Sequence, residues 1–148
     1  TPEGNYFLTP NPDMTLTVPA ATENVITFGG YDNVTNAFYP KSGRGFTREN
    51  RIKPDLTAPA VNVYGPGISG GYTRRTGTSV ACALGAGACA QILQWGIVED
   101  NEPYMKNNYI KNYLIRGAER NRDIRYPSEQ WGYGTINVFD SFLILTRT

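Results

Sequence analysis

An uncharged stretch of small and apolar residues stands out in the pattern of hydrophobic and polar positions along the chain. It covers residues 79–95 and consists mainly of Ala, Gly, Cys, Leu and Ile. Because a helix that is apolar on every face is typical of a protein interior, we predict a helix here that is buried on every face. Gly85 and Gly87 each disfavour this helix by about 1 kcal/mol relative to alanine. We therefore expect neighbouring elements to pack very closely against it.

Two further helices are predicted towards the C-terminus. The segment 107–117 is amphipathic, and Gly117 is suited to its C-terminal end. Its apolar residues, spaced i, i+3, i+4 and i+8, are Ile110, Tyr113, Leu114 and Ala118. Residues 138–145 are predicted to form a short apolar helix, and the polar residues 119–130 before it are predicted to form a loop.

Strands are predicted in the first half of the chain. Residues 24–30 are rich in β-forming residues and are closed by two glycines, and residues 61–65 form a second strand candidate. Gly70 and Gly71 lie between β-forming residues, as in a hairpin turn. Residues 1–22 contain four prolines and are expected to be irregular or to lie at a sheet edge.

Length and charge restrict the classes of protein to which the chain can belong. With 148 residues, of which 40% are hydrophobic and 18% charged, it is about the size of one globular domain. A net charge of +1 gives no electrostatic basis for binding nucleic acid or an anionic membrane. No run of about 18 apolar residues is found, so we expect no membrane span. The N-terminus lacks a signal-peptide pattern and an initiator Met, so we expect the chain to be part of a longer protein.

Neither a disulfide nor a metal centre is expected. Cys82 and Cys89 lie seven residues apart in the predicted helix, about 10 Å along its axis, which is too far for a disulfide. The chain contains no histidine, and one cysteine pair at this spacing does not suit zinc. We therefore predict that both cysteines are small buried packing residues and that the protein uses no cofactor. Trp95 and Trp131 are also expected to be packing aromatics.

A serine begins the predicted buried helix, in the sequence Gly77-Thr78-Ser79. The N-terminus of a helix has unpaired N–H groups and the positive end of the helix dipole, which favour negative charge developing nearby. A serine in this position can attack a carbonyl carbon, and its own N–H group can bind the resulting oxyanion. The alternative is that Ser79 is only the N-cap of the helix in an unrelated α/β domain.

Five segments of the chain carry a resemblance to a known family. They are Asn24-Val25-Ile26-Thr27-Phe28-Gly29, Ser42-Gly43-Arg44-Gly45, Lys53-Pro54-Asp55-Leu56-Thr57-Ala58-Pro59, Gly77-Thr78-Ser79-Val80-Ala81 and Gly132-Tyr133-Gly134-Thr135-Ile136-Asn137. In order and spacing they resemble landmarks of the subtilisin-like serine proteases, the subtilases. The landmarks are the strand that ends in glycine, the Ser-Ser-Arg-Gly turn, the Lys-Pro-Asp-x-x-Ala-Pro segment, the nucleophile motif and the closing Gly-x-Gly-x-Ile/Val-Asp/Asn. The resemblance covers nearly the whole chain.

The resemblance implies an α/β fold, the C-terminal part of the subtilisin-like doubly wound parallel sheet, with a buried helix that starts at the nucleophile. Ser79 would be the nucleophile of a serine endopeptidase that forms an acyl-enzyme. In the family the catalytic Asp and His and the oxyanion-hole Asn precede this region. We therefore expect residues 1–148 to be a single partial domain, with 1–22 as its N-terminal segment, that is inactive in isolation.

The resemblance also implies site residues and partners. Arg75, Thr76, Gly77 and Thr78 would bind substrate, with Gly77 allowing the substrate backbone to approach closely. Arg74 and Arg75 at the cleft edge would favour acidic substrate residues, or would simply be solvated charges. The partners would be a peptide or protein substrate and the N-terminal half of the same catalytic domain. Self-association is a further expectation where apolar surface is left uncovered.

Some positions depart from the family pattern. Ala83 and Leu84 stand where the family usually has Pro, often followed by His, and Ala60 stands where Gly follows Ala-Pro. Some relatives keep Ala at the first of these places, so Ala83 does not imply inactivity. A noncatalytic subtilase-fold pseudoprotease, acting as a regulatory or binding module, is the alternative function, because the upstream Asp and His could have been lost.

Residues 7–19 are similar to subtilases of spore-forming bacteria, which include germination proteases. Family habit would then favour a secreted, cell-surface or spore-associated setting. Asp55 is expected to make structural hydrogen bonds, because the family's catalytic acid lies upstream.

Overall fold

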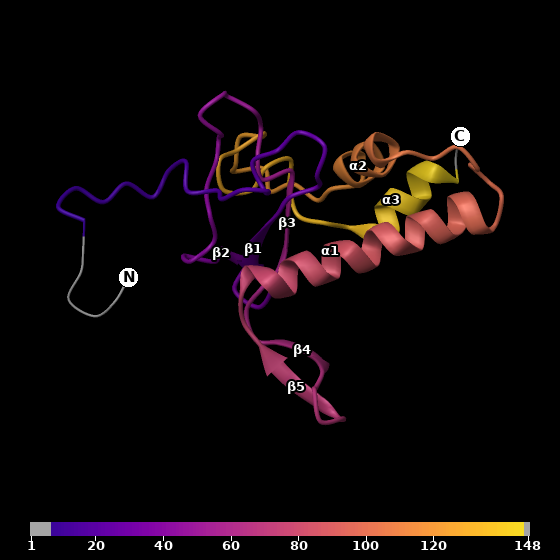
Figure 1. The fold of residues 1–148 in the computed structure, drawn as a ribbon, viewed down its shortest axis with the longest axis horizontal. Helices are drawn as coiled ribbons and strands as arrows, with labels where there is room; N and C mark the ends of the chain where they lie inside the picture. The colour runs from indigo at the N-terminus through magenta and orange to yellow at the C-terminus, as the bar shows by residue number, and fades with distance from the viewer. Residues whose placement is uncertain (1–6, 147–148) are drawn as a thin grey trace.

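The computed structural model describes residues 7–146, which form an α/β fold of mixed sheets and helices. Figure 1 shows a long helix that runs along one side of the molecule, with two shorter helices beside its C-terminal part and a hairpin projecting from its N-terminal end. The elements in chain order are β1 (Phe28–Asp32), β2 (Ala37–Phe38), β3 (Leu56–Pro59), β4 (Val63–Pro66), β5 (Tyr72–Arg75), α1 (Thr78–Leu93), the π-helical turn η1 (Gln94–Val98), α2 (Asn107–Arg116) and α3 (Val138–Leu145).

The three-stranded sheet places β1 between β2 and β3. β1 runs parallel to β3, with Phe28 opposite Leu56, and antiparallel to β2. The other two strands, β4 and β5, form a separate antiparallel hairpin. Within residues 7–146 the predicted parallel sheet is therefore represented by β1 and β3, and the remaining strand pairs are antiparallel.

The predicted strands are confirmed with shifted bounds. The strand expected at 24–30 is β1, which begins only at Phe28, and the strand expected at 61–65 is β4. Gly70 and Gly71 have φ values of 86° and 67° and form the turn of the β4–β5 hairpin, as predicted. β3 was not predicted, because prolines within and before this strand obscure its pattern.

The main hydrophobic core lies between the sheet and the three helices. Its buried members are Leu56, Ala88, Ile92, Met105, Ile110, Leu114, Ala118 and Leu145. The amphipathic helix predicted at 107–117 is confirmed as α2, and α3 has the predicted bounds. A Cβ at Gly117 would lie 2.4 Å from the backbone nitrogen of Ser141, so glycine at the end of α2 allows α3 to pack directly against it.

The prediction that α1 is buried on every face is wrong. One stripe of the helix faces the sheet and the core, and its residues are Ala81, Gly85, Ala88 and Ile92. The opposite face is exposed, and its residues include Ser79, Cys82, Ala86 and Ala90. Because both faces carry small apolar residues, the sequence pattern alone does not distinguish the face that meets solvent.

Close packing against α1 is confirmed at one of the two glycines. A Cβ at Gly85 would lie 2.2 Å from the ring of Phe28, so β1 can approach the helix only because the residue is glycine. A Cβ at Gly87 would meet no atom within 4 Å among the described residues. The prediction for Gly87 therefore fails in this structure.

Two further expectations about α1 need correction. Together with η1 it forms a segment, Thr78–Val98, that is long and apolar enough to cross a membrane, contrary to the expectation that none would be. Length and composition are the only basis of that finding, and the core helix of a folded domain can have both. Cys89 is half-buried but Cys82 is exposed, so only Cys89 fits the packing role predicted for both; both thiols are free.

Both tryptophans pack as predicted. Trp131 is 9% exposed and contacts the rings of Tyr31 and Phe38 at centroid distances of 5.8 and 6.0 Å. Trp95 packs against the edge of the main core.

Candidate active site at the start of helix α1

Ser79 lies in the first turn of α1. Figure 1 shows that this helix begins directly after the β4–β5 hairpin. The helix begins at Thr78 and its N-cap is Gly77, so Ser79 is the second helical residue. The interpretation of Ser79 as the N-cap is therefore wrong. Ser79 is exposed, and its hydroxyl makes no hydrogen bond to any residue in the range 7–146.

Backbone hydrogen bonds fix the turn that presents Ser79. Gly77 has φ 151° and ψ 158°, a conformation that residues with a Cβ rarely adopt. Its N–H group donates to the carbonyl oxygen of Ala60 at 2.8 Å, and the N–H group of Ala60 donates to the carbonyl oxygen of Tyr31 at 2.8 Å. The turn is therefore attached to the C-terminal ends of both parallel strands, β3 and β1.

The helix end at Ser79 is suited to a developing negative charge. Within the described part of the chain, the N–H groups of Thr78 and Ser79 have no hydrogen-bond acceptor, whereas that of Val80 donates to the carbonyl oxygen of Gly77 at 3.0 Å. Free N–H groups and the helix dipole both stabilise an anion at this position. The site therefore combines an accessible hydroxyl with an anion-stabilising helix end. The chain supplies no histidine to act as a base.

The four residues predicted to bind substrate form one continuous turn. Arg75 ends β5 and is exposed, and Thr76 is also exposed. Gly77 and Thr78 are half-buried. The side chain of Thr76 accepts a hydrogen bond from the N–H group of Asn62 at 2.9 Å, which holds the end of β5 to the start of β4. These residues thus border the face on which Ser79 is exposed.

A buried carboxylate, Asp55, anchors the start of β3. Its Oδ2 accepts hydrogen bonds from the N–H group of Thr27 at 2.7 Å and from Lys53 Nζ at 2.6 Å. Its Oδ1 lies 2.5 Å from Nζ of Lys111 on α2. Burial lowers the pKa of Lys53 from its ordinary value, and the neighbouring Asp55 offsets part of this effect. The predicted structural role of Asp55 is confirmed, whereas no sequence signal pointed to Lys111.

The closing motif, residues 132–137, lies along β3. The N–H groups of Tyr133 and Ile136 donate to the carbonyl oxygens of Asp55 and Thr57, each at 2.8 Å. This segment therefore forms hydrogen bonds along β3, the strand that leads to Ala60. Through Ala60 it helps to hold the turn before Ser79, which we call the serine turn. It also connects that strand to α3.

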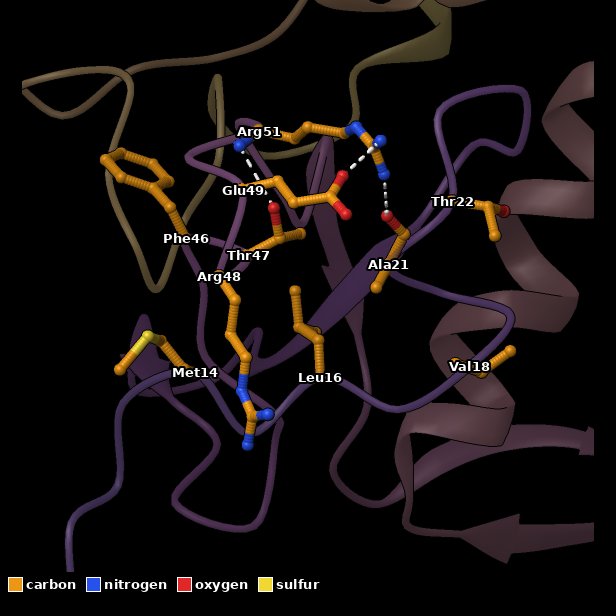
Figure 2. Close-up of a pocket in the computed structure, with 10 residues that line it drawn as sticks. All are labelled: Met14, Leu16, Val18, Ala21, Thr22, Phe46, Thr47, Arg48, Glu49 and Arg51. Atoms are coloured by element: carbon orange, nitrogen blue, oxygen red, sulfur yellow. Dashed lines mark hydrogen bonds and ion pairs between the residues drawn. The ribbon is translucent and has the colours of Figure 1, made fainter.

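A pocket between the N-terminal segment and residues 46–51 is separate from the serine turn (Figure 2). Arg51 is paired with Glu49 and donates a hydrogen bond to the carbonyl oxygen of Ala21 at 3.4 Å. None of the predicted site residues lines this pocket. No group of three or more potential metal ligands occurs in the part of the chain that the structure describes. The turn at Ser79 is therefore the candidate active site.

The sequence is similar to proteases from several organisms. The sequence model of the Subtilase family, Peptidase_S8, matches residues 3–134. Membrane-bound transcription factor site-1 protease of Mus musculus is 30% identical over an alignment of 138 positions, which covers 89% of this chain and 12% of that protein. Serine protease AprX of Bacillus subtilis is 28% identical over an alignment of 148 positions, which covers 86% of this chain and 32% of that protein.

Solved structures of proteases are similar to this fold. The CspB protease of Clostridium perfringens superposes with a TM-score of 0.90 and 37% identity, over 95% of this chain and 31% of that chain. The prenylagaramide maturation protease PagA superposes with a TM-score of 0.71 and 25% identity, over 89% of this chain and 46% of that chain. The chain thus spans less than half the length of each relative. By its family match and its fold, this chain belongs to the subtilase family of serine proteases.

Proposed function

We propose that this chain supplies the nucleophile of a subtilisin-like endopeptidase, and that the nucleophile is Ser79. The observation that carries the proposal is an exposed serine hydroxyl in the first turn of α1, beside N–H groups that have no acceptor within residues 7–146. Such a position suits attack on a peptide carbonyl and binding of the oxyanion that results. The substrate would run past Arg75, Thr76, Gly77 and Thr78.

The reaction needs groups that this chain lacks. Ser79 Oγ would form a bond to the carbonyl carbon and transfer its proton to a histidine base. The same base would then protonate the departing amine as the C–N bond breaks, and water would hydrolyse the ester. Because the 148 residues contain no histidine, we assign the base, its Asp partner and the oxyanion Asn to an upstream part of the same catalytic domain. The chain alone is then inactive.

The exposed face of α1 is the surface that this upstream part would cover. Ser79 lies on the same side of the helix as Cys82, Ala86 and Ala90, all exposed. A groove beside this side is lined by Leu84, Gly87 and Gln91 of α1, with Tyr31 and Ile136 on its other wall. Apolar surface of this kind is typical of an interface. A domain half seated on it would bring its histidine to the side of the helix where the serine is exposed.

A fluorophosphonate probe applied to the longer protein tests this function. The expected result is labelling of Ser79, mapped by mass spectrometry and lost in Ser79→Ala. The 148-residue chain by itself should not be labelled at a comparable rate, because removal of triad partners costs several orders of magnitude in rate. Absence of labelling in a folded, fully processed longer protein would contradict the assignment of Ser79.

The alternative function is a noncatalytic subtilase-fold module with a regulatory or binding role. It applies if the upstream Asp and His of the triad have been lost. Unlabelled Ser79 together with retained binding of peptide would support this alternative. The likeness of residues 7–19 to subtilases of spore-forming bacteria stays a proposal, to which the similarity with the CspB protease of Clostridium perfringens adds support.

A further inference from the structure

The β4–β5 hairpin projects from the body of the protein immediately before the serine turn (Figure 1). Tyr64 and Arg74 are directly opposite each other in the hairpin, so their side chains lie on the same face. Tyr72 is two residues before Arg74 and therefore shares that face as well. Arg75 points to the other face, opposite Val63. We refer to Tyr64, Tyr72 and Arg74 as the hairpin face.

The three side chains of the hairpin face are organised but exposed. The rings of Tyr64 and Tyr72 stack with centroids 5.1 Å apart and an angle of 17° between their planes. The guanidinium carbon of Arg74 lies 5.9 Å from the Tyr64 ring centroid, and Nη1 of Arg74 donates to the carbonyl oxygen of Asn62 at 3.1 Å. Nevertheless, Tyr64 and Tyr72 are 65% and 67% exposed. Two stacked aromatic rings that contact solvent to this extent are characteristic of a binding surface.

The charge of the hairpin is uncompensated. Residues 61–76 contain two arginines and no acidic residue. Neither Arg74 nor Arg75 forms an ion pair with a carboxylate in the range 7–146. Because the guanidinium of Arg74 is already oriented by Asn62 and Tyr64, its remaining N–H groups can bind a carboxylate with little further loss of side-chain freedom. One oriented arginine beside two aromatic rings suits a short acidic segment better than a nucleic acid, which needs many phosphate contacts.

We propose that the hairpin face is an exosite that binds an acidic segment of the protein substrate, outside the residues that border the scissile bond. A carboxylate of that segment accepts hydrogen bonds from Arg74, and an adjacent apolar side chain packs on the two tyrosine rings. The assignment of the bound segment to a substrate rests on the function proposed for Ser79. The binding itself does not require a competent active site.

Binding is measured on the longer protein that carries Ser79→Ala, so that no cleavage occurs. The probe is a fluorescein-labelled peptide of sequence Gly-Glu-Glu-Tyr-Glu-Glu-Gly, and its counterpart has Gln in place of each Glu. Fluorescence anisotropy should show binding of the acidic peptide, weakened by salt, and markedly weaker binding of the neutral one. Arg74→Gln should lower the affinity about three- to tenfold, Arg74→Lys should lower it less, and Tyr72→Phe should leave it almost unchanged because the ring is retained.

The matched control is Arg122→Gln, which removes an exposed arginine from the loop at 119–130. Its affinity for the acidic peptide should equal that of the parent protein. An equal loss in Arg122→Gln and Arg74→Gln would overturn the exosite, because it would indicate a general effect of net charge. Equal affinity for the acidic and neutral peptides would also overturn it. The exosite would also be overturned if a single-stranded oligonucleotide displaced the acidic peptide at a lower concentration than unlabelled peptide does. A dimer in sedimentation that Arg74→Gln dissociates would overturn it as well.

Cleavage kinetics separate the exosite from the proposed function. In the active longer protein, Arg74→Gln should raise the KM for a substrate extended by the acidic sequence and leave kcat/KM for a short neutral substrate unchanged. Fluorophosphonate labelling of Ser79 should be the same in both proteins. If Ser79 is never labelled but the peptide still binds through Arg74, the endopeptidase assignment fails while the hairpin face remains a binding site. If labelling is normal and Arg74→Gln has no effect on either measurement, only the exosite fails.

Discussion

The N–H group of Gly77 donates a hydrogen bond to the carbonyl oxygen of Ala60 at 2.8 Å, which ties the residue before the helix of Ser79 to the end of β3. This bond is possible because Gly77 has φ 151° and ψ 158°, which allows the chain to leave β5 and enter α1 at once. The position of Ser79 is thus determined by the backbone conformation of Gly77 and by its hydrogen bond to the end of β3. Within residues 7–146, the side chain of Ser79 makes no hydrogen bond that would support the turn.

Gly77→Ala should therefore destabilise the turn. A residue with a Cβ in this conformation costs about 1–3 kcal/mol, although among the described residues the Cβ itself would meet only the nitrogen of Ser79, at 3.9 Å. We expect a lower free energy of unfolding by urea denaturation and, in the longer protein, a large loss of fluorophosphonate labelling at Ser79. The matched control is Gly65→Ala, since Gly65 lies in β4 and a Cβ there would meet no atom within 4 Å in the part of the chain that the structure describes. Equal stability of the two variants would contradict this account of Gly77.

The two glycines of α1 should respond to substitution in opposite directions. Gly85→Ala would place a Cβ 2.2 Å from the Phe28 ring and should destabilise the chain by about 1–3 kcal/mol. Gly87→Ala would meet no atom of residues 7–146 within 4 Å and should stabilise the helix by up to about 1 kcal/mol. Both values refer to urea unfolding of the 148-residue chain, provided that circular dichroism shows a cooperative transition. If Gly87→Ala destabilised this chain, the result would contradict the prediction, because it would show that other atoms already cover the face of α1 that carries Gly87.

The same Gly87→Ala substitution in the longer protein tests what covers α1. If the upstream half of the domain packs on the face of α1 that carries Gly87, the added methyl group should lower the free energy of unfolding of the longer protein instead of raising it. A change of sign between the two proteins is the expected result. Stabilisation of equal size in both would contradict the proposed docking of the upstream half on α1.

Asp55→Asn should be among the most destabilising conservative substitutions in the chain. Asp55 is 0% exposed and Lys53 is 1% exposed, so loss of the carboxylate leaves one ammonium group buried and a second, that of Lys111, without its partner. Removing one partner of a buried ion pair typically costs about 3–5 kcal/mol. Lys53→Met should cost less, because Lys111 still pairs with the carboxylate.

The control for the Asp55 cluster is Asp123→Asn, which neutralises an exposed carboxylate in the loop at 119–130. Its stability should remain within about 0.5 kcal/mol of the parent chain. The measurement is the free energy of unfolding in urea at constant ionic strength. A loss below about 1 kcal/mol in Asp55→Asn would mean that the carboxylate is not needed to compensate the two ammonium groups.

Secondary structure was predictable where local pattern and packing agree. The i, i+3, i+4 spacing of Ile110, Tyr113 and Leu114 identified α2, because the polar residues between them left one face apolar. The two glycines at the hairpin turn were also informative, because positive φ at both is needed there. In α1, by contrast, alanine and glycine occur on both faces. Burial of that helix depends on which elements lie beside it, and the sequence of the helix does not encode this.

The candidate site was predictable in part, because its motif is local. Gly77, Thr78 and Ser79 are consecutive, so their proximity needs no knowledge of the fold. The supports of the turn are distant in sequence: Ala60 is 17 residues before Gly77, and Lys111 lies 56 residues after Asp55. Every residue type has a backbone carbonyl oxygen, so the sequence does not show which one accepts a hydrogen bond. A lysine on a helix is normally solvated, so the sequence does not indicate a buried ion pair either. Such contacts can be identified only once the three-dimensional arrangement of the strands and helices is known.

The two cysteines should differ sharply in reactivity. Cys82 is exposed, whereas Cys89 is half-buried and burial raises the pKa of its thiol above the ordinary value of 9.0. Since the thiolate is the reactive form, a disulfide reagent at pH 8 should modify Cys82 quickly and Cys89 slowly in the folded 148-residue chain. The variants Cys82→Ala and Cys89→Ala assign the two phases. In the longer protein the fast phase should also slow, because the upstream half covers the face that carries Cys82.

The raised pKa of Cys89 also gives stability a defined dependence on pH. The native state holds this proton more tightly than the unfolded chain, so the contribution is fully present below about pH 9 and is lost as pH rises through the raised value. Urea unfolding between pH 8 and 10 should therefore show a steeper loss of stability in the parent chain than in Cys89→Ala. Cys82→Ala, which removes an exposed thiol, should follow the parent chain. Identical slopes for the parent chain and Cys89→Ala would show that the Cys89 thiol is not buried in the folded protein, and the packing of this side of α1 against the core would then need revision.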